Sequence, residues 1–170
     1  MHRFFISIFL FVVLFFIAGC IMDSDTQRLI PPADMIERLN IPFREHGYSN
    51  FPTTIIDSPD SLQRFIAGIE TQSNWNEKGA FLTVLNDSTL NLNQYTLLLF
   101  RQTEPSGSIQ LSVQQPYITD GLLNVEIKRS IPSVGTADMA YYALAYKIQK
   151  SYKHIRFRIE DLPVVNITLP

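Results

Sequence analysis

The stretch QYTLLLFRQ, residues 94–102, is apolar on both sides of an extended chain from Tyr95 to Phe100. Successive side chains of a β-strand point to opposite faces, so a strand with one solvated face alternates between apolar and polar residues. Because this stretch does not alternate, we predict that it forms a central strand, and we examine the segments on either side of it.

The segments that follow do alternate, which predicts strands with one solvated face. DMAYYALAYKIQK, residues 138–150, fits either a helix or a strand, and we favour a strand because tyrosine packs well across neighbouring strands. Together these runs predict an antiparallel sheet. The side chains expected to point inward are Ile109, Leu111, Val113, Leu123, Val125, Ile127, Ile155, Phe157, Ile159, Val165, Ile167 and Leu169, and those expected outward include Asn124, Glu126 and Lys128.

The preceding half of the chain predicts a short strand and a helix. Residues 53–57 are the strand candidate. A helix is predicted over residues 59–72, with Ser58 as its N-cap and Pro59 at its first position, where a missing N–H costs nothing. The apolar residues that recur at helical spacing are Leu62, Phe65, Ile66 and Ile69.

A second helix is predicted over residues 74–86 with Ser73 as its cap, although AFLTVL, residues 80–85, also suits a strand. ADMIER, residues 34–39, is predicted to form one helical turn against the domain. The fold class is therefore α+β, with one or two helices (about 59–72 and 74–86) packed on a mainly antiparallel, sandwich-like or curled sheet (about 94–169).

The chain begins MHRFFISIFLFVVLFFIAGC, which has the three parts of a secretory signal: a positive end at Arg3, an apolar run and small residues before Cys20. As a helix, the run from Phe4 to Ile17 would be roughly 21 Å long, which is short for the ~30 Å apolar core of a bilayer. We therefore predict a signal peptide over residues 1–19.

Ile17-Ala18-Gly19-Cys20 resembles the lipobox of bacterial lipoproteins, in which an aliphatic residue and two small residues precede a cysteine. The resemblance implies a diacylglycerol on the Cys20 thiol, cleavage before Cys20, and acylation of the new amino group by a fatty acid such as palmitate. Two or three acyl chains anchor a protein stably. Because residue 21 is Ile and not Asp, the outer membrane, facing the periplasm, is favoured. The alternatives are an uncleaved anchor or an ordinary signal with a chance cysteine.

After the signal, residues 20–33 are expected to be the lipidated cysteine and a tether, and residues 34–170 a single extracytoplasmic domain. The net charge of the whole chain is −2 and there is no basic run, so no nucleic-acid partner is expected. Cys20 is the only cysteine, so its lipidation leaves no thiol for a disulfide, a nucleophile or a metal ligand.

Two loops are rich in hydroxyl groups and small residues: RQTEPSGS, residues 101–108, and VGTADMAYY, residues 134–142. Gly107 and Gly135 would let the backbone adopt a positive φ or approach a ligand closely. The functional hypothesis is a shared polar rim, and the alternative is two ordinary turns. The rim would consist of Arg101, Ser106, Ser108, Thr136 and Asp138.

The order LLLFRQTEPSGS, LLNVEIKR and ADMAYYALAYKIQK resembles the C-terminal domain of PrcB-type protease-complex subunits over roughly residues 53–160. This chain has PSGS where that family has two adjacent glycines. The resemblance implies a β-rich interaction module associated with an extracytoplasmic protease, and it supplies no catalytic residues.

Catalytic and metal-binding patterns are sparse after the signal. Only His46 and His154 remain as histidines, they are far apart in the sequence, and there is no Gly-x-Ser-x-Gly stretch. We therefore expect no enzyme activity, no cofactor and no metal. The main expectation is a lipoprotein that binds a protein partner, such as a protease or an envelope component. The alternatives are binding of a small ligand or glycan and, third, an envelope hydrolase.

Overall fold

The computed structural model describes residues 28–170, and Cys20 and the lipobox lie outside them. In chain order the elements are β1 (Ile36–Leu39), the 3-10 helix η1 (His46–Asn50), β2 (Thr54–Ile56), α2 (Pro59–Glu70), α3 (Lys78–Leu85), the 3-10 helix η2 (Ser88–Leu90), β3 (Tyr95–Glu104), β4 (Gln110–Val113), β5 (Tyr117–Thr119), β6 (Leu122–Ser130), β7 (Ala140–Gln149), β8 (His154–Ile159) and β9 (Val165–Thr168).

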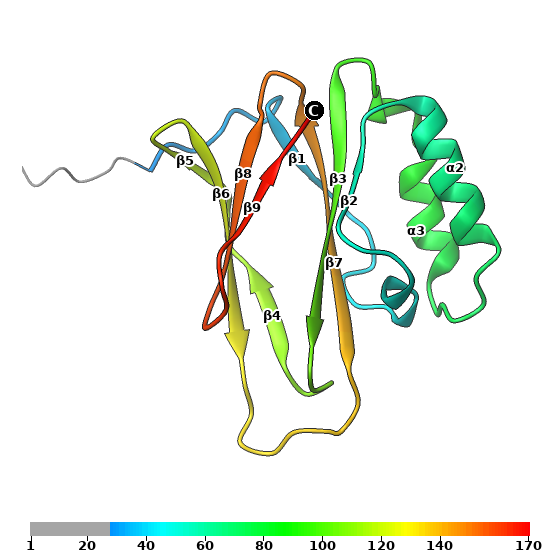
Figure 1. Ribbon diagram of the computed structural model, residues 1–170, viewed down its shortest axis with the longest axis vertical. Helices are drawn as coiled ribbons and strands as arrows, with labels where there is room; N and C mark the ends of the chain where they lie inside the picture. Colours follow the sequence, from blue (N-terminus) through cyan, green and yellow to red (C-terminus); the bar gives the residue numbers. More distant parts are fainter. Residues whose placement is uncertain (1–27) are drawn as a thin grey trace, which may run out of the picture.

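The strands form two sheets, which face each other in Figure 1. The helix-covered sheet has the order β1-β7-β3-β2 and is antiparallel throughout. The open sheet has the order β4-β6-β8-β9, with β5 also paired to β6. Its β6 and β8 are parallel, since β7, which connects them in the chain, belongs to the other sheet. Both helices lie on the outer side of the helix-covered sheet (Figure 1).

The central strand β3 is covered on both faces, as its sequence predicts. Leu97 and Leu99 belong to the core beneath the helices, whereas Leu98 and Phe100 belong to the core between the two sheets. Phe100 stacks on Phe157 of the open sheet with ring centroids 3.9 Å apart. The helices therefore pack on one face of β3 and the open sheet packs on the other.

The prediction of an α+β domain with two helices and mainly antiparallel strands is confirmed, but the strands form two sheets and two of them, β1 and β2, precede residue 94. Residues 138–150 contain the strand β7, as favoured from their tyrosines. One predicted inward residue, Val165, is 37% exposed because β9 is an edge strand.

Helix α2 begins where the sequence predicts. The Ser58 Oγ accepts a hydrogen bond from the backbone N–H of Ser61 at 3.3 Å, and Pro59 occupies the first turn. Leu62, Ile66 and Ile69 are buried against the helix-covered sheet.

The prediction that the second helix starts at residue 74 with Ser73 as its cap is wrong, because a distant carboxylate holds the preceding loop. Glu45, which is only 3% exposed, accepts hydrogen bonds from the backbone N–H groups of Asn76 and Glu77 at 2.6 and 2.8 Å. These donors precede α3, which begins at Lys78. A partner from another part of the chain therefore sets the start of the helix.

The prediction of a helical turn over residues 34–39 is also wrong, since residues 36–39 form β1 along the edge of β7. Ile36 packs on the core between the sheets and Leu39 on the core beneath the helices. An i, i+3 pair of apolar residues is a helical spacing, but in a strand it places one side chain on each face. The local pattern was therefore ambiguous, and pairing with β7 decided it.

A buried ion pair joins the two sheets. Glu104 at the end of β3 is fully buried, and its carboxylate accepts from the Nε and Nη2 of Arg129 on β6 at 3.2 and 2.7 Å. Gln102 donates a further hydrogen bond to the same carboxylate at 3.0 Å. The Arg129 side chain is 8% exposed. Two parallel hydrogen bonds on a dry ion pair fix the spacing of the sheets at this end.

We expect the substitution Glu104→Ala to lower the free energy of unfolding by about 3–5 kcal/mol, because it leaves the Arg129 charge buried without a partner. The double substitution E104L/R129M should recover most of this loss, since an apolar pair removes both buried charges. Urea denaturation followed by circular dichroism measures the difference. The control is Glu37→Ala, which breaks the more exposed pair with Lys147 and should cost less than about 1 kcal/mol. Equal effects of E104A and E37A would contradict the assignment.

Candidate functional site

Four of the five predicted rim residues meet where the β3–β4 loop and the β6–β7 loop touch. The Thr136 backbone N–H donates to the Oγ atoms of Ser106 and Ser108, each at 3.0 Å. Ser106 Oγ donates to the Thr136 carbonyl at 2.8 Å, and the Gly107 N–H donates to the Asp138 carbonyl at 2.7 Å. We call Ser106, Gly107, Ser108, Thr136 and Asp138 the loop clasp.

The clasp includes one partner that the sequence analysis missed. The Arg44 Nη1 donates to the Gly107 carbonyl at 2.8 Å, and its Nη2 lies 3.9 Å from Asp138 Oδ2. A Cβ at Gly107 would lie 2.4 Å from the same carboxylate oxygen, so the close neighbour of this glycine is the Asp138 side chain, and its approach to a ligand stays a prediction. Arg44 precedes β7 by about a hundred residues in the chain and carries no local signal of this role.

The fifth predicted rim residue, Arg101, lies elsewhere. It is on the face of β3 that carries Leu97 and Leu99, and its Nη1 donates to the Ser49 carbonyl at 3.4 Å. Its backbone N–H donates to Thr53 Oγ1 at 3.0 Å. Arg101 therefore holds η1 and β2 on the helix side, and it does not contribute to a shared rim.

Within the clasp, the polar groups bind one another. Thr136 Oγ1 accepts from Ser108 Oγ at 3.2 Å, and a hydrogen bond from the Thr136 side chain holds the pKa of Asp138 below its ordinary value of 3.8, with a smaller effect from Arg44. Groups that satisfy one another leave few free donors or acceptors for a ligand. The clasp is better suited to holding the two loops in one conformation.

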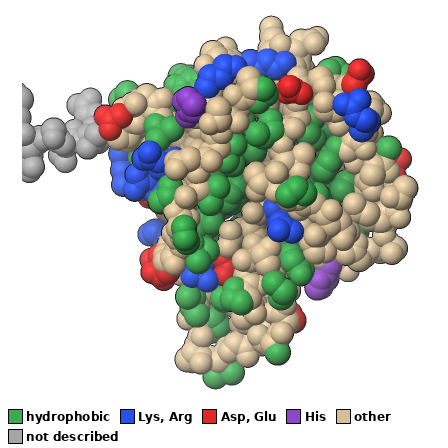
Figure 2. Space-filling view, viewed as in Figure 1, with side chains coloured by type: hydrophobic (Ala, Val, Ile, Leu, Met, Phe, Trp, Pro, Cys, Tyr) green, Lys and Arg blue, Asp and Glu red, His purple; other side chains and the backbone are tan. Residues whose placement is uncertain are grey.

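The clasp presents an apolar tip. The β6–β7 loop, residues 131–139, is exposed along its whole length. Ile131 is 57% exposed, Val134 81% and Met139 48%. Figure 2 shows hydrophobic side chains at the lower end of the molecule, where this loop lies in Figure 1. We call residues 131–139 the apolar tip.

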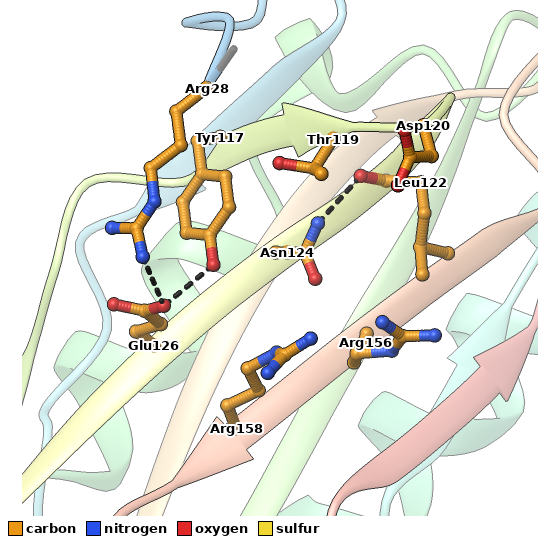
Figure 3. A pocket seen from close by; sticks show the side chains of 9 residues that line it. All are labelled: Arg28, Tyr117, Thr119, Asp120, Leu122, Asn124, Glu126, Arg156 and Arg158. Carbon is orange, nitrogen blue, oxygen red and sulfur yellow. Dashed lines mark hydrogen bonds and ion pairs between the residues drawn. The ribbon is translucent and has the colours of Figure 1, made fainter. Parts of the chain in front are cut away.

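The outer face of the open sheet carries a polar groove of about 530 Å³. Its walls are β5, β6 and β8, together with Arg28 from the start of the described chain, and Figure 3 shows its side chains. The hairpin between β5 and β6 turns at Asp120 and Gly121, which have φ of 52° and 72°. Two successive positive φ angles are typical of the tight Asp-Gly hairpin turn. The lining residues are Arg28, Tyr117, Thr119, Asp120, Leu122, Asn124, Glu126, Arg156 and Arg158.

On one side of the groove, three polar side chains bind one another. Glu126 accepts from the Tyr117 hydroxyl at 2.6 Å and from Arg28 at 3.4 Å, while the Arg28 guanidinium lies 4.4 Å from the centroid of the Tyr117 ring. Burial, followed by the hydrogen bond to Glu126, raises the pKa of Tyr117 above its ordinary value. This cluster attaches the chain entering from residue 28 to the open sheet, as do two hydrogen bonds between Leu29 and Ile118.

The histidines lie apart from this groove. His46 lines a smaller cavity of about 170 Å³ between η1 and the start of β7, and the Nδ1 of His154 lies 3.4 Å from the Thr168 hydroxyl. Between residues 28 and 170, no group of three or more His, Cys, Asp or Glu side chains is placed to hold a metal ion.

No protein-family model, curated protein or solved structure matches this chain. The resemblances to the lipobox and to PrcB-type subunits therefore remain predictions. Over the same described residues, no helix is both long enough and apolar enough to cross a bilayer.

We expect the substitution Thr136→Val to raise the pKa of Asp138 toward 3.8, because it removes the largest cause of the lowered value. A carboxylate with a lowered pKa stabilises the fold above its ordinary pKa, and this contribution is lost as the pH falls through the folded value. The clasp should therefore loosen only in strong acid. An NMR titration of the Asp138 carboxyl carbon measures the pKa, with Thr83→Val on α3 as control. An unchanged Asp138 pKa in T136V would contradict the assignment.

Proposed function

We propose that this chain is a membrane-anchored lipoprotein whose extracytoplasmic domain binds a protein partner through the apolar tip. Two features support the proposal: the lipobox pattern that ends at Cys20 and the exposed apolar side chains of residues 131–139. The exposed apolar side chains carry the proposal of binding. The lipobox pattern carries the proposal of location, which is the bacterial outer membrane, facing the periplasm, with Cys20 acylated.

The apolar tip has the properties of an interaction surface. Large apolar side chains on a monomer are normally scattered, and a group of them on one element marks a contact site. The clasp holds the base of this loop through the Thr136 and Asp138 backbone. A loop held in one conformation loses less entropy on binding, which favours affinity.

The anchor limits where the partner is found. At most 3.6 Å per residue, the segment from Cys20 to Arg28 reaches roughly 29 Å, so an acylated Cys20 would keep the domain beside its membrane. The partner would therefore be another envelope protein. The resemblance to PrcB-type subunits makes an extracytoplasmic protease the first candidate to test.

Intact-mass analysis of the full-length protein from bacterial membranes tests the anchor. We expect a chain that begins at Cys20 and carries a diacylglycerol and one further acyl group. The Cys20→Ala variant should keep residues 1–19 and carry no lipid. A free thiol, or an N-terminus at Met1 in the unsubstituted protein, would contradict the proposal of lipidation while leaving the binding function open.

Crosslinking in intact cells, followed by purification and mass spectrometry, tests the apolar tip. We expect one stoichiometric partner, and we expect the double substitution V134S/M139S to reduce its recovery about tenfold or more, because it removes two of the three large exposed apolar side chains of the tip. The matched control is Val164→Ser, since Val164 is 48% exposed on a different loop and should leave recovery unchanged.

Equal recovery with the tip variant and the control would overturn the assignment of the tip. Both variants alter exposed side chains, so their folding is expected to match that of the parent protein, and thermal unfolding checks this.

A further inference from the structure

The groove on the open sheet contains a buried acceptor without a partner. Asn124 is only 1% exposed; its Nδ2 donates to the Leu122 carbonyl at 2.8 Å, but its Oδ1 has no hydrogen-bond partner among residues 28–170. The Thr119 hydroxyl is buried and equally without a partner there. In Figure 3 the Asn124 oxygen points away from Leu122, toward the side of the groove that β8 forms.

Such atoms are informative because buried polar groups in native proteins are nearly always hydrogen-bonded. Leaving one unpaired costs the free energy of its lost contact with water. The sequence predicted Asn124 to face outward into solvent, but in the structure it is buried, at the position of β6 that pairs with Tyr117 of β5. A ligand with a hydroxyl or N–H donor would supply the missing partner.

The opposite wall supplies positive charge. Arg156 and Arg158 alternate with buried residues of β8, so both project from the outer face of the sheet, and they pair in register with Asn124 and Glu126 of β6. Arg156 Nε donates to Asn166 at 3.2 Å, whereas the guanidinium of Arg158 makes no hydrogen bond or ion pair with the part of the chain that the structure describes.

The acidic residues of the groove do not neutralise this wall. Glu126 is already bound by Arg28 and Tyr117, and Asp120 lies exposed at the hairpin turn. A guanidinium with free N–H groups recognises carboxylate and phosphate oxygens through two parallel hydrogen bonds. The groove therefore combines two arginines with a carbonyl acceptor and a hydroxyl.

From these features we infer that the groove binds a small hydroxylated anion, such as a sugar acid or a sugar phosphate. The anion pairs with Arg158 and Arg156, while a ligand hydroxyl donates to the Asn124 Oδ1 and another bonds to the Thr119 hydroxyl. The volume of about 530 Å³ lies in the range of small-molecule sites, and a lining that is almost wholly polar suits a polar ligand. This site is independent of the lipid anchor and of the apolar tip.

Isothermal titration calorimetry on the full-length protein in a non-ionic detergent tests the inference. The probes are glucuronate and glucose 6-phosphate, with neutral glucose and inorganic phosphate as comparators. We expect at least one of the two hydroxylated anions to bind about tenfold or more tightly than both comparators. Glucose or phosphate binding as tightly as the tighter of the two probes would overturn the chemistry. So would the absence of binding by either probe at 10 mM, on the order of the weakest small-ligand affinities, together with no Arg158-dependent binding to the vesicles described below.

Variants locate the binding. Arg158→Gln should weaken the binding about tenfold, and Thr119→Val should weaken it by a smaller factor without lowering the thermal midpoint, because the lost hydroxyl has no partner in the protein. The matched control is Arg64→Gln on the exposed side of α2, which should have no effect. Equal binding by R158Q and R64Q would overturn the site.

The same chemistry occurs on phospholipid headgroups, which carry a phosphate and hydroxyls. Vesicles that contain phosphatidylglycerol distinguish this source: binding that R158Q weakens, seen with vesicles and not with free sugars, would support a membrane lipid as the hydroxylated anion. Because the acyl anchor binds any bilayer, the readout is the gain in binding when phosphatidylglycerol replaces phosphatidylcholine in the vesicles. A gain that R158Q does not reduce would overturn the groove as the site.

Discussion

The structure depends on the burial of β3 and β7 on both of their faces. Their side chains alternate between two cores, one beneath the helices and one between the sheets. On β7, small residues face the helices (Ala143 and Ala145) and large residues face the open sheet (Leu144 and Tyr146). Because apolar burial is the main favourable term in folding, these two strands hold the three layers together.

Much of this architecture can be predicted from local sequence. The unbroken apolar run at residues 95–100 indicates a strand covered on both sides, and Ser58-Pro59 indicates the start of α2. The failures have a common cause, which is a partner distant in the chain. Glu45 sets the start of α3 from about thirty residues away. Residues 36–39 have a spacing that suits a helical turn and become a strand only because the edge of β7 accepts them.

The candidate sites divide in the same way. The polar residues of two loops were enough to predict that Ser106, Ser108, Thr136 and Asp138 lie together, and the structure brings these four together. The prediction that Arg101 belongs to the rim was wrong, because alternation along β3 places its side chain on the face that packs against the helices. The groove was missed, since its residues come from β5, β6, β8 and the start of the domain. From its sequence alone Asn124 is an ordinary solvent-facing position, whereas in the structure it is buried. Only the tertiary structure shows that the Asn124 Oδ1 is buried without a hydrogen-bond partner.

The pairing of β1 with β7 has a consequence for how this domain is made. Glu37 and Lys147 lie 110 residues apart in the chain and face each other across this pairing. Contacts between such distant residues slow folding, because a long loop must close before they form. A chain is synthesised amino end first, so β1 has no neighbouring strand until β7, residues 140–149, has also been made. Until then an unpaired strand edge is exposed, and aggregation or chaperone capture is more favoured than in the finished protein.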